Sequence, residues 1–137
     1  MTADEQHDDR TRSFTVLAAG TIVSHYRIVS KIGAGGMGEV YLAEDTELKR
    51  QVALKFLPPH LCVDEDCRKR FKREAQSAAG LDHSNIVTVH EVGEFEARPF
   101  IVMQYIAGQS LKDYPGKGEL SIGQILDLSI QICDGLK

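Results

Sequence analysis

Four glycines, Gly33, Gly35, Gly36 and Gly38, gather in the segment KIGAGGMGEV. Glycines at this spacing can bring backbone N–H groups close to a phosphate, because they carry no side chain that would obstruct the approach. In a dinucleotide-binding fold such a segment leads into a helix, whose N-terminus holds the pyrophosphate. Here the following residues, EVYLAED, have a period of two, which predicts a strand. The pattern therefore favours a glycine hairpin between two strands, which can cover a triphosphate or be a plain turn.

Two charged residues stand where the surrounding pattern is apolar. Lys55 lies in the strand-like segment VALKF, and Glu74 lies on the apolar stripe of a predicted helix. Each has an ordinary explanation, since an edge-strand lysine can extend to water and Glu74 can pair with Arg70 one turn earlier. One joint explanation is an ion pair between Lys55 on the sheet and Glu74 on the helix. Such a pair would avoid the cost of leaving either charge unpaired on an apolar face. That pair would hold the lysine where it can reach phosphates beneath the glycine hairpin.

The hydrophobic pattern also predicts the elements that would position these residues. A helix is expected between the N-cap Asp64 and the stop residue Gly80, and another begins at Ser121, which has capping-box spacing to Gln124. The order of three strands, a helix, two strands, a linker and a helix favours an antiparallel sheet over a doubly wound parallel one. Period-two alternation and bounding turn residues place the five strands at 26–32, 39–45, 51–57, 86–96 and 98–106.

Composition restricts the class of protein. A chain of 137 residues suits one ordinary domain, and a net charge of −4 gives no reason to expect nucleic acid or an anionic membrane as partner. The three cysteines, Cys62, Cys67 and Cys133, form no CxxC pair, which favours a reduced, cytoplasmic compartment and gives no zinc site. No apolar run approaches the ~20 residues of a membrane span, and the N-terminus is unlike a secretory signal.

In their order and spacing these motifs resemble the N-terminal lobe of eukaryotic-type protein kinases, in the bacterial serine/threonine branch. The resemblance extends from about Tyr26 to the end of the chain and is carried by GAGGMGEV, VALK, FKREAQ, HSNIV and FIVMQYIAGQSL. It implies an α+β, kinase-like lobe with a five-stranded antiparallel sheet, one main helix and the first helix or helices of a truncated helical C-lobe. The implied divisions are a disordered tail at 1–20, the lobe with glycine-rich loop and hinge at 21–106, and a linker with the first C-lobe helix at 107–137.

The resemblance also implies a role for each candidate site residue. The glycines would cover the phosphates of ATP, and Lys55 would contact the α- and β-phosphates while it pairs with Glu74. Adenine would lie among apolar side chains with Met103 at its back as gatekeeper, and the backbones of Gln104 and Ile106 would bind its edge. Ordinary core packing also explains the apolar side chains of Met103, Val40 and Ile32. The complete set of implied ATP-binding residues is Ile32, Gly33, Ala34, Gly35, Gly36, Met37, Gly38, Val40, Ala53, Lys55, Met103, Gln104 and Ile106.

The motifs that transfer the phosphate are absent from the sequence. Phosphoryl transfer needs metal ligands and a carboxylate that orients the substrate hydroxyl, which the family supplies from HRDxxxxN and DFG motifs. Neither occurs here, so the resemblance implies no catalytic residue and no metal ligand in this chain, with the Mg²⁺ ligands beyond Lys137. We expect this chain to be the ATP-binding part of a cut serine/threonine kinase and to be inactive alone. It would lack the C-lobe, its structural partner. The parent protein could carry a membrane anchor downstream of this segment. The alternatives are a truncated lobe that acts as a non-catalytic binding or regulatory module and, third, a dinucleotide-binding domain.

Overall fold

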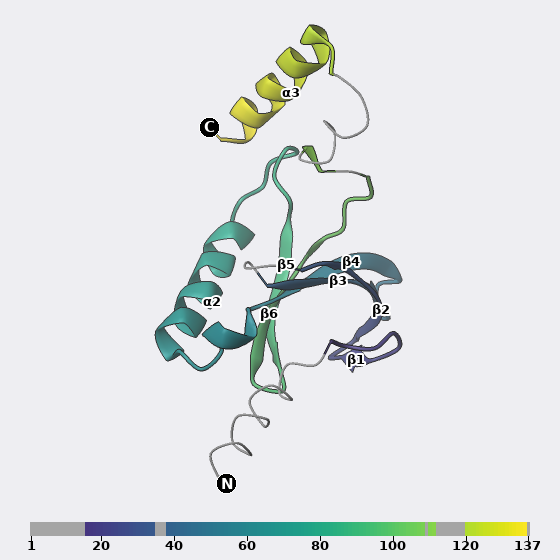
Figure 1. Cartoon of the computed structure of the whole chain (residues 1–137), viewed down its shortest axis with the longest axis vertical. Coiled ribbons are helices and arrows are strands. Elements are labelled where there is room, and N and C mark those ends of the chain that lie inside the picture. The colour runs from purple at the N-terminus through teal and green to yellow at the C-terminus, as the bar shows by residue number, and fades with distance from the viewer. Residues whose placement is uncertain (1–15, 35–37, 109, 112–119, 137) are drawn as a thin grey trace, which may run out of the picture.

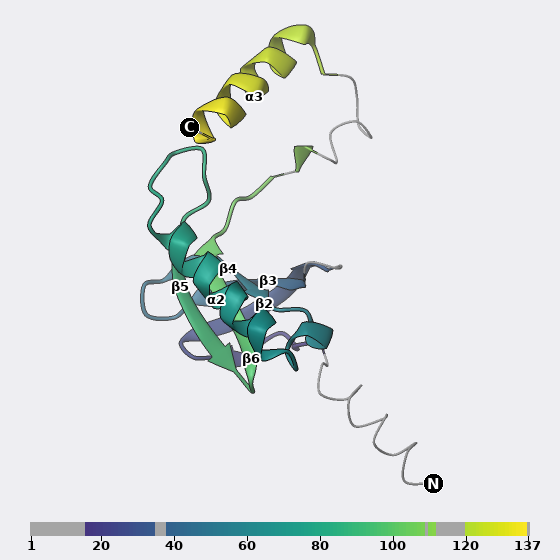
Figure 2. The same cartoon turned by 90° about the vertical axis from the view of Figure 1, so that its left-hand side faces the viewer.

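The chain forms a curled antiparallel sheet with one helix beside it and a second helix beyond its end (Figures 1 and 2). In this computed structural model the described residues are 16–34, 38–108, 110–111 and 120–136. Within them the sheet has six strands in the order β1-β2-β3-β4-β6-β5. The strands are β1 (Ile22–Val23), β2 (Tyr26–Gly33), β3 (Glu39–Asp45), β4 (Arg50–Phe56), β5 (Val89–Phe95) and β6 (Arg98–Gln104).

The expected α+β class with an antiparallel sheet is confirmed, but the sheet has one strand more than the five expected. The additional strand, β1, contains two residues and pairs with β2 through Ile22 to Arg27 and Val23 to Tyr26. A segment this short shows no periodicity, so the alternation pattern cannot reveal it. Residues before it also join the fold, because the Leu17 backbone N–H donates to the Tyr41 hydroxyl at 3.1 Å and its side chain packs against the core.

The core lies inside the curl of the sheet. Tyr26 in β2 donates a hydrogen bond to Glu91 in β5, although these strands lie far apart in the sheet order. Burial, and then the bond to Glu91, raises the pKa of the Tyr26 hydroxyl well above its usual range. The contact therefore marks where the two ends of the sheet approach each other. The enclosed core cluster consists of Val23, Tyr26, Ile28, Tyr41, Ala43, Val52, Leu54, Phe56, Phe100 and Val102.

The helix α2 (Glu65–Ala79) begins and ends where the sequence predicts. The Asp64 side chain accepts from the backbone N–H groups of Asp66 and Cys67, and Gly80 follows the last helical residue. The helix lies against β5 and β6 and buries Ala75 there (Figure 2). Before it, two consecutive prolines end β4 and begin a short 3₁₀ helix, η1 (Pro59–Leu61).

The helix α3 (Ile122–Gly135) carries the expected capping box. The Gln124 N–H donates to the Ser121 hydroxyl at 3.1 Å, and the Ser121 N–H donates to the Gln124 side chain at 2.9 Å. Its C-terminal half meets the loop between α2 and β5, where the Asn85 amide donates to the Gln131 carbonyl at 2.9 Å. The apolar side chains of α3 are nevertheless exposed: Ile122, Ile125, Leu126, Ile130 and Ile132, with Leu136 just beyond.

Asp45 fixes the turn between β3 and β4. Replacing it with asparagine is expected to lower stability by an amount that depends on pH. Burial alone would raise the pKa of this carboxyl, but the backbone N–H groups of Leu48 and Glu47, with His25 and Arg50, together lower it. A lowered pKa in the folded state stabilises the protein above the unfolded-state pKa of about 3.9, and this contribution is lost as the pH falls through the folded value. Asp45→Asn should therefore unfold more easily in urea at pH 7 than wild type.

The difference between Asp45→Asn and wild type should shrink steadily below pH ~4, where the wild-type carboxyl becomes protonated. Asp82→Asn, which changes an exposed carboxyl in the turn after α2, is the matched control and should leave stability close to wild type throughout. A difference between Asp45→Asn and wild type that is the same at pH 7 and pH ~3 would contradict this account.

Candidate functional site

Two rows of paired residues cross β3, β4 and β6 on one face of the sheet. In the first row Val40 pairs with Lys55, and Lys55 pairs with Ile101. Directly paired residues on antiparallel strands project from the same face, so these three side chains are neighbours. The second row, two residues further along β4, joins Leu42, Ala53 and Met103 in the same way. The candidate residues Val40, Ala53, Lys55 and Met103 therefore share one face.

The helix α2 covers the same face as Lys55. Val92 in β5 pairs with Ile101, which extends the first row to the edge of the sheet. Val92 lines a groove together with Arg68 of α2, so the row that contains Lys55 ends beneath this helix. The side chains of the other face, among them Phe56 and Phe100, fill the core. Lys55 and the helix that carries Glu74 thus lie on one side of the sheet, as an ion pair between them requires.

The ion pair itself is not formed in this structure. Lys55 is half-buried and Glu74 is exposed, and no ion pair or hydrogen bond joins either side chain to another described residue. Glu74 immediately precedes Ala75, the residue that α2 buries against the sheet, so it flanks the contact surface of the helix. The ion pair therefore stays a prediction, and its formation requires a change in the two side chains or in the position of α2.

The two described glycines of the glycine-rich segment differ in what the fold requires of them. Gly38 has φ +106°, and a Cβ there would lie 2.2 Å from the Phe56 carbonyl oxygen, so a side chain cannot be accommodated. At Gly33 a Cβ would meet only Val40, at an ordinary 3.5 Å. Ala34 is exposed, and Gly35, Gly36 and Met37 lie outside the described residues. The fold explains Gly38, whereas the absence of a side chain at Gly33 has no packing reason.

The remaining candidate residues surround these two rows. Ile32 lies at an irregularity of the β2–β3 pairing and is 46% exposed, and Met103 is half-buried. The Gln104 backbone N–H donates to the Thr88 carbonyl at 2.8 Å, so only its carbonyl is left to bind an adenine edge. The Ile106 backbone, in contrast, forms no hydrogen bond with the described residues. Its N–H can therefore donate to a ligand.

Glu39 lies in a network of polar contacts that the sequence did not reveal. Its carboxylate accepts from the Tyr41 hydroxyl at 2.7 Å and lies 3.6 Å from the Arg98 guanidinium and 3.8 Å from the Lys31 ammonium. Arg98 is buried and stacks over the Phe56 ring. This network ties the residue after Gly38 to β2 and β6. No sequence signal could have found it, because Arg98 lies far from Glu39 in the chain and the alternation pattern treats each member as an ordinary strand residue.

Two kinds of site are absent from the described part of the chain. No group of three or more histidine, cysteine, aspartate or glutamate side chains there could hold a metal ion. Within the same residues no helix has the length and apolar character that crossing a membrane requires.

A curled antiparallel sheet with one helix across its last two strands, and a lysine on the helix side of its central strand, defines the N-terminal lobe of a protein kinase. The sequence profile described as the protein kinase domain matches residues 26–137, so the chain belongs to this family.

The chain is similar to serine/threonine-protein kinases from several bacteria. It is 53% identical over 97 residues to PknJ of Mycobacterium tuberculosis, covering 71% of this chain and 16% of that protein. It is 42% identical over 122 residues to PrkC of Bacillus subtilis, covering 88% of this chain and 19% of that protein. The crystal structure of the PknI kinase domain of Mycobacterium tuberculosis is 33% identical with a TM-score of 0.76, covering 88% of this chain and 50% of that domain. The chain therefore spans under a fifth of these two curated relatives and about half of a solved kinase domain.

Proposed function

We propose that this chain is the ATP-binding part of a serine/threonine protein kinase, which transfers the γ-phosphate of ATP to a serine or threonine of a protein. The observation that carries the proposal is a half-buried lysine without a counter-charge: Lys55 has no ion pair with the described residues. Such a group gains most from an anionic ligand, because charge-assisted hydrogen bonds to phosphate are strong. Membership of the protein kinase family and its named relatives support ATP as that ligand.

The residues present fit the parts of ATP. Val40, Ala53 and Met103 offer an apolar surface for adenine, and the Gln104 carbonyl and Ile106 N–H can bind its edge. The open backbone at Gly33 allows a phosphate to approach closely. Lys55 would orient the α- and β-phosphates, and Glu74 would restrain the lysine once α2 brings the two together. When bound, Mg²⁺ neutralises charge on the transferred phosphate, and its ligands would lie in the rest of the kinase domain. The complete protein would act in the cytoplasm.

The proposal predicts that residues 1–137 alone do not transfer phosphate. The purified chain, incubated with radiolabelled MgATP and a generic protein substrate, should show no transfer above a blank. Its sequence contains neither the HRDxxxxN nor the DFG motif, which supply the carboxylate that orients the hydroxyl and the metal ligands. Lys55→Met serves as the control for a contaminating kinase. Transfer by the wild-type chain that disappears in Lys55→Met would overturn this prediction.

An alternative function is a non-catalytic module that binds a partner through its apolar surfaces. It is favoured by the exposure of α3, whose Leu126 and Ile130 are 59% and 61% exposed and need a covering surface. The DNA that follows the codon for Lys137 distinguishes the two functions. An open frame with HRD and DFG motifs supports the kinase, whereas a stop codon supports the module.

A further inference from the structure

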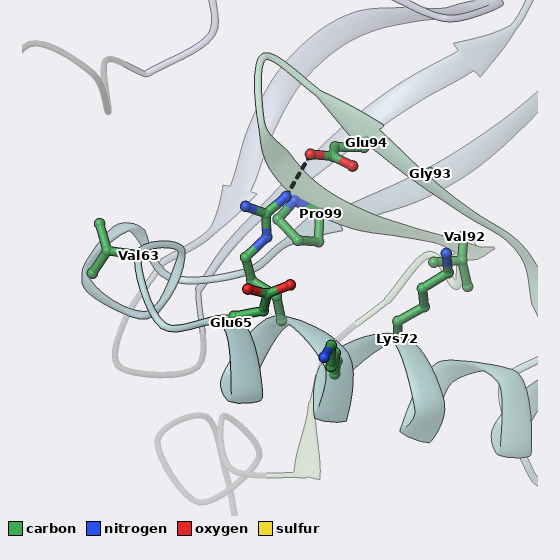
Figure 3. Close-up of a pocket in the computed structure, with 9 residues that line it drawn as sticks. Val63, Glu65, Lys72, Val92, Gly93, Glu94 and Pro99 are labelled. Carbon is green, nitrogen blue, oxygen red and sulfur yellow. Dashed lines mark hydrogen bonds and ion pairs between the residues drawn. The ribbon is translucent and has the colours of Figure 1, made fainter.

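A groove of about 490 Å³ lies between the first half of α2 and the β5–β6 pair, and Lys55 is not among its lining residues (Figure 3). Its walls combine apolar and cationic side chains. Val63, Val92 and Pro99 supply apolar surface, and the cations come from α2. Figure 3 shows Lys72 extending from the helix toward Val92 on the opposite wall. The groove is thus a site with positive charge on one side and apolar surface on the other.

The positive charge of the groove is only partly compensated. Arg68 forms an ion pair with Glu94 across the groove, as the dashed line in Figure 3 shows, and Glu65 lies nearby. Lys69 and Lys72 form no ion pair with any described residue. This local surplus of cations contrasts with the net charge of −4 of the whole chain. An acidic segment is the occupant with complementary charge.

The chain itself contains such a segment. Residues 4–9 read DEQHDD, which has four carboxylates and no lysine or arginine, and they lie outside the described residues. Leu17 and Phe95 pack against the same core cluster, on the face of the sheet opposite the groove. Phe95 directly follows Glu94, which lines the groove on the edge strand β5, so the segment would pass around this edge to reach it. Asp9 precedes Leu17 by a stretch that can extend about 26 Å at ~3.3 Å per residue. The tether gives the carboxylates a high effective concentration at sites on this chain that a stretch of this length can span.

We propose that residues 4–9 of this chain bind in the groove, with their carboxylates against Lys69 and Lys72. The groove shares no lining residue with the candidate ATP-binding set, so the proposal does not rest on ATP binding. Binding of the segment would also have a regulatory consequence, because the helix that forms one wall of the groove, α2, carries Glu74. A segment that bridges α2 to the sheet restrains the helix that carries Glu74.

The proposal is tested by nuclear magnetic resonance on the full ¹⁵N-labelled chain. The variant Lys69→Gln/Lys72→Gln removes the two uncompensated charges, whereas Arg70→Gln/Arg73→Gln removes the same charge from α2 at positions that do not line the groove. We expect the first variant to move the amide signals of residues 4–9 to their positions in a free peptide of residues 1–15. The second should leave them at the wild-type positions. High salt should reproduce the first change, because it screens exposed charges.

Three results would overturn the proposal. Signals of residues 4–9 that coincide with the free peptide in the wild-type chain would show that the segment is not bound. Equal movement in both variants would show that charge on α2, and not the groove, is responsible. Signals that depend on protein concentration, together with a dimeric mass in solution, would assign the groove to the segment of a second copy.

Discussion

Gly38→Ala is expected to lower the free energy of unfolding by roughly 2–4 kcal/mol, since it adds backbone strain to a steric clash. The backbone at Gly38 has φ +106°, which residues with a side chain rarely adopt. The new Cβ would lie 2.2 Å from the Phe56 carbonyl oxygen and 3.3 Å from Pro58, so the start of β3 must move away from β4. Urea denaturation of the variant and the wild type measures the loss.

Gly33→Ala is the matched control for this prediction. Its Cβ would only contact Val40 at 3.5 Å, so stability should change by less than about 1 kcal/mol. Its effect should instead appear in the affinity for MgATP, because the methyl group occupies space that a phosphate needs. Equal destabilisation by the two substitutions would contradict the different roles assigned to the two glycines.

Lys55→Met is expected to weaken the binding of MgATP at least about tenfold. A hydrogen bond from a charged group contributes roughly 1.5–3 kcal/mol, and each 1.4 kcal/mol corresponds to a factor of ten in affinity. Methionine is also unbranched and apolar, with a thioether sulfur in place of one methylene, and it lacks the ammonium, so the fold should remain. Isothermal titration calorimetry with MgATP gives the affinity, and a urea transition close to that of wild type shows that the variant is folded.

Lys49→Met is the control for the loss of one positive charge. Lys49 is exposed in the turn between β3 and β4 and lies outside the two rows of candidate residues. Its variant should bind MgATP as wild type does. If Lys55→Met binds as tightly as wild type, or if both variants lose the same affinity, the phosphate contact assigned to Lys55 is wrong.

The sequence predicted those parts of the fold that depend on local pattern. Alternation located the long strands, and capping residues located both helices, since Asp64 and Ser121 accept the hydrogen bonds expected of N-caps. It also placed Lys55 on the side of the sheet that α2 covers, because a period of two separates it from Leu54 and Phe56 in the core. These features follow from residues that are close together in the chain.

Contacts between distant residues could not be predicted in this way. The hydrogen bond from Tyr26 to Glu91 closes the curled sheet across 65 positions of the sequence, and neither residue departs from an ordinary strand pattern. The approach of Arg98 to Glu39 likewise depends on how β3 and β6 are arranged. The ion pair between Lys55 and Glu74 is the opposite case. Two unusual positions predicted it, and it depends on where α2 lies.

The binding of MgATP to the face formed by β3, β4 and β6 is the central claim, and titration of the ¹⁵N-labelled chain with MgATP tests it most directly. We predict saturable shifts in the backbone amide signals of Val40, Ala53, Met103 and Ile106, with smaller changes in α3. The same titration of Lys55→Met should require a higher concentration of MgATP to reach the same shifts. The claim would be contradicted if wild type showed no saturable shift at millimolar MgATP, or if the shifts were confined to the groove beside α2.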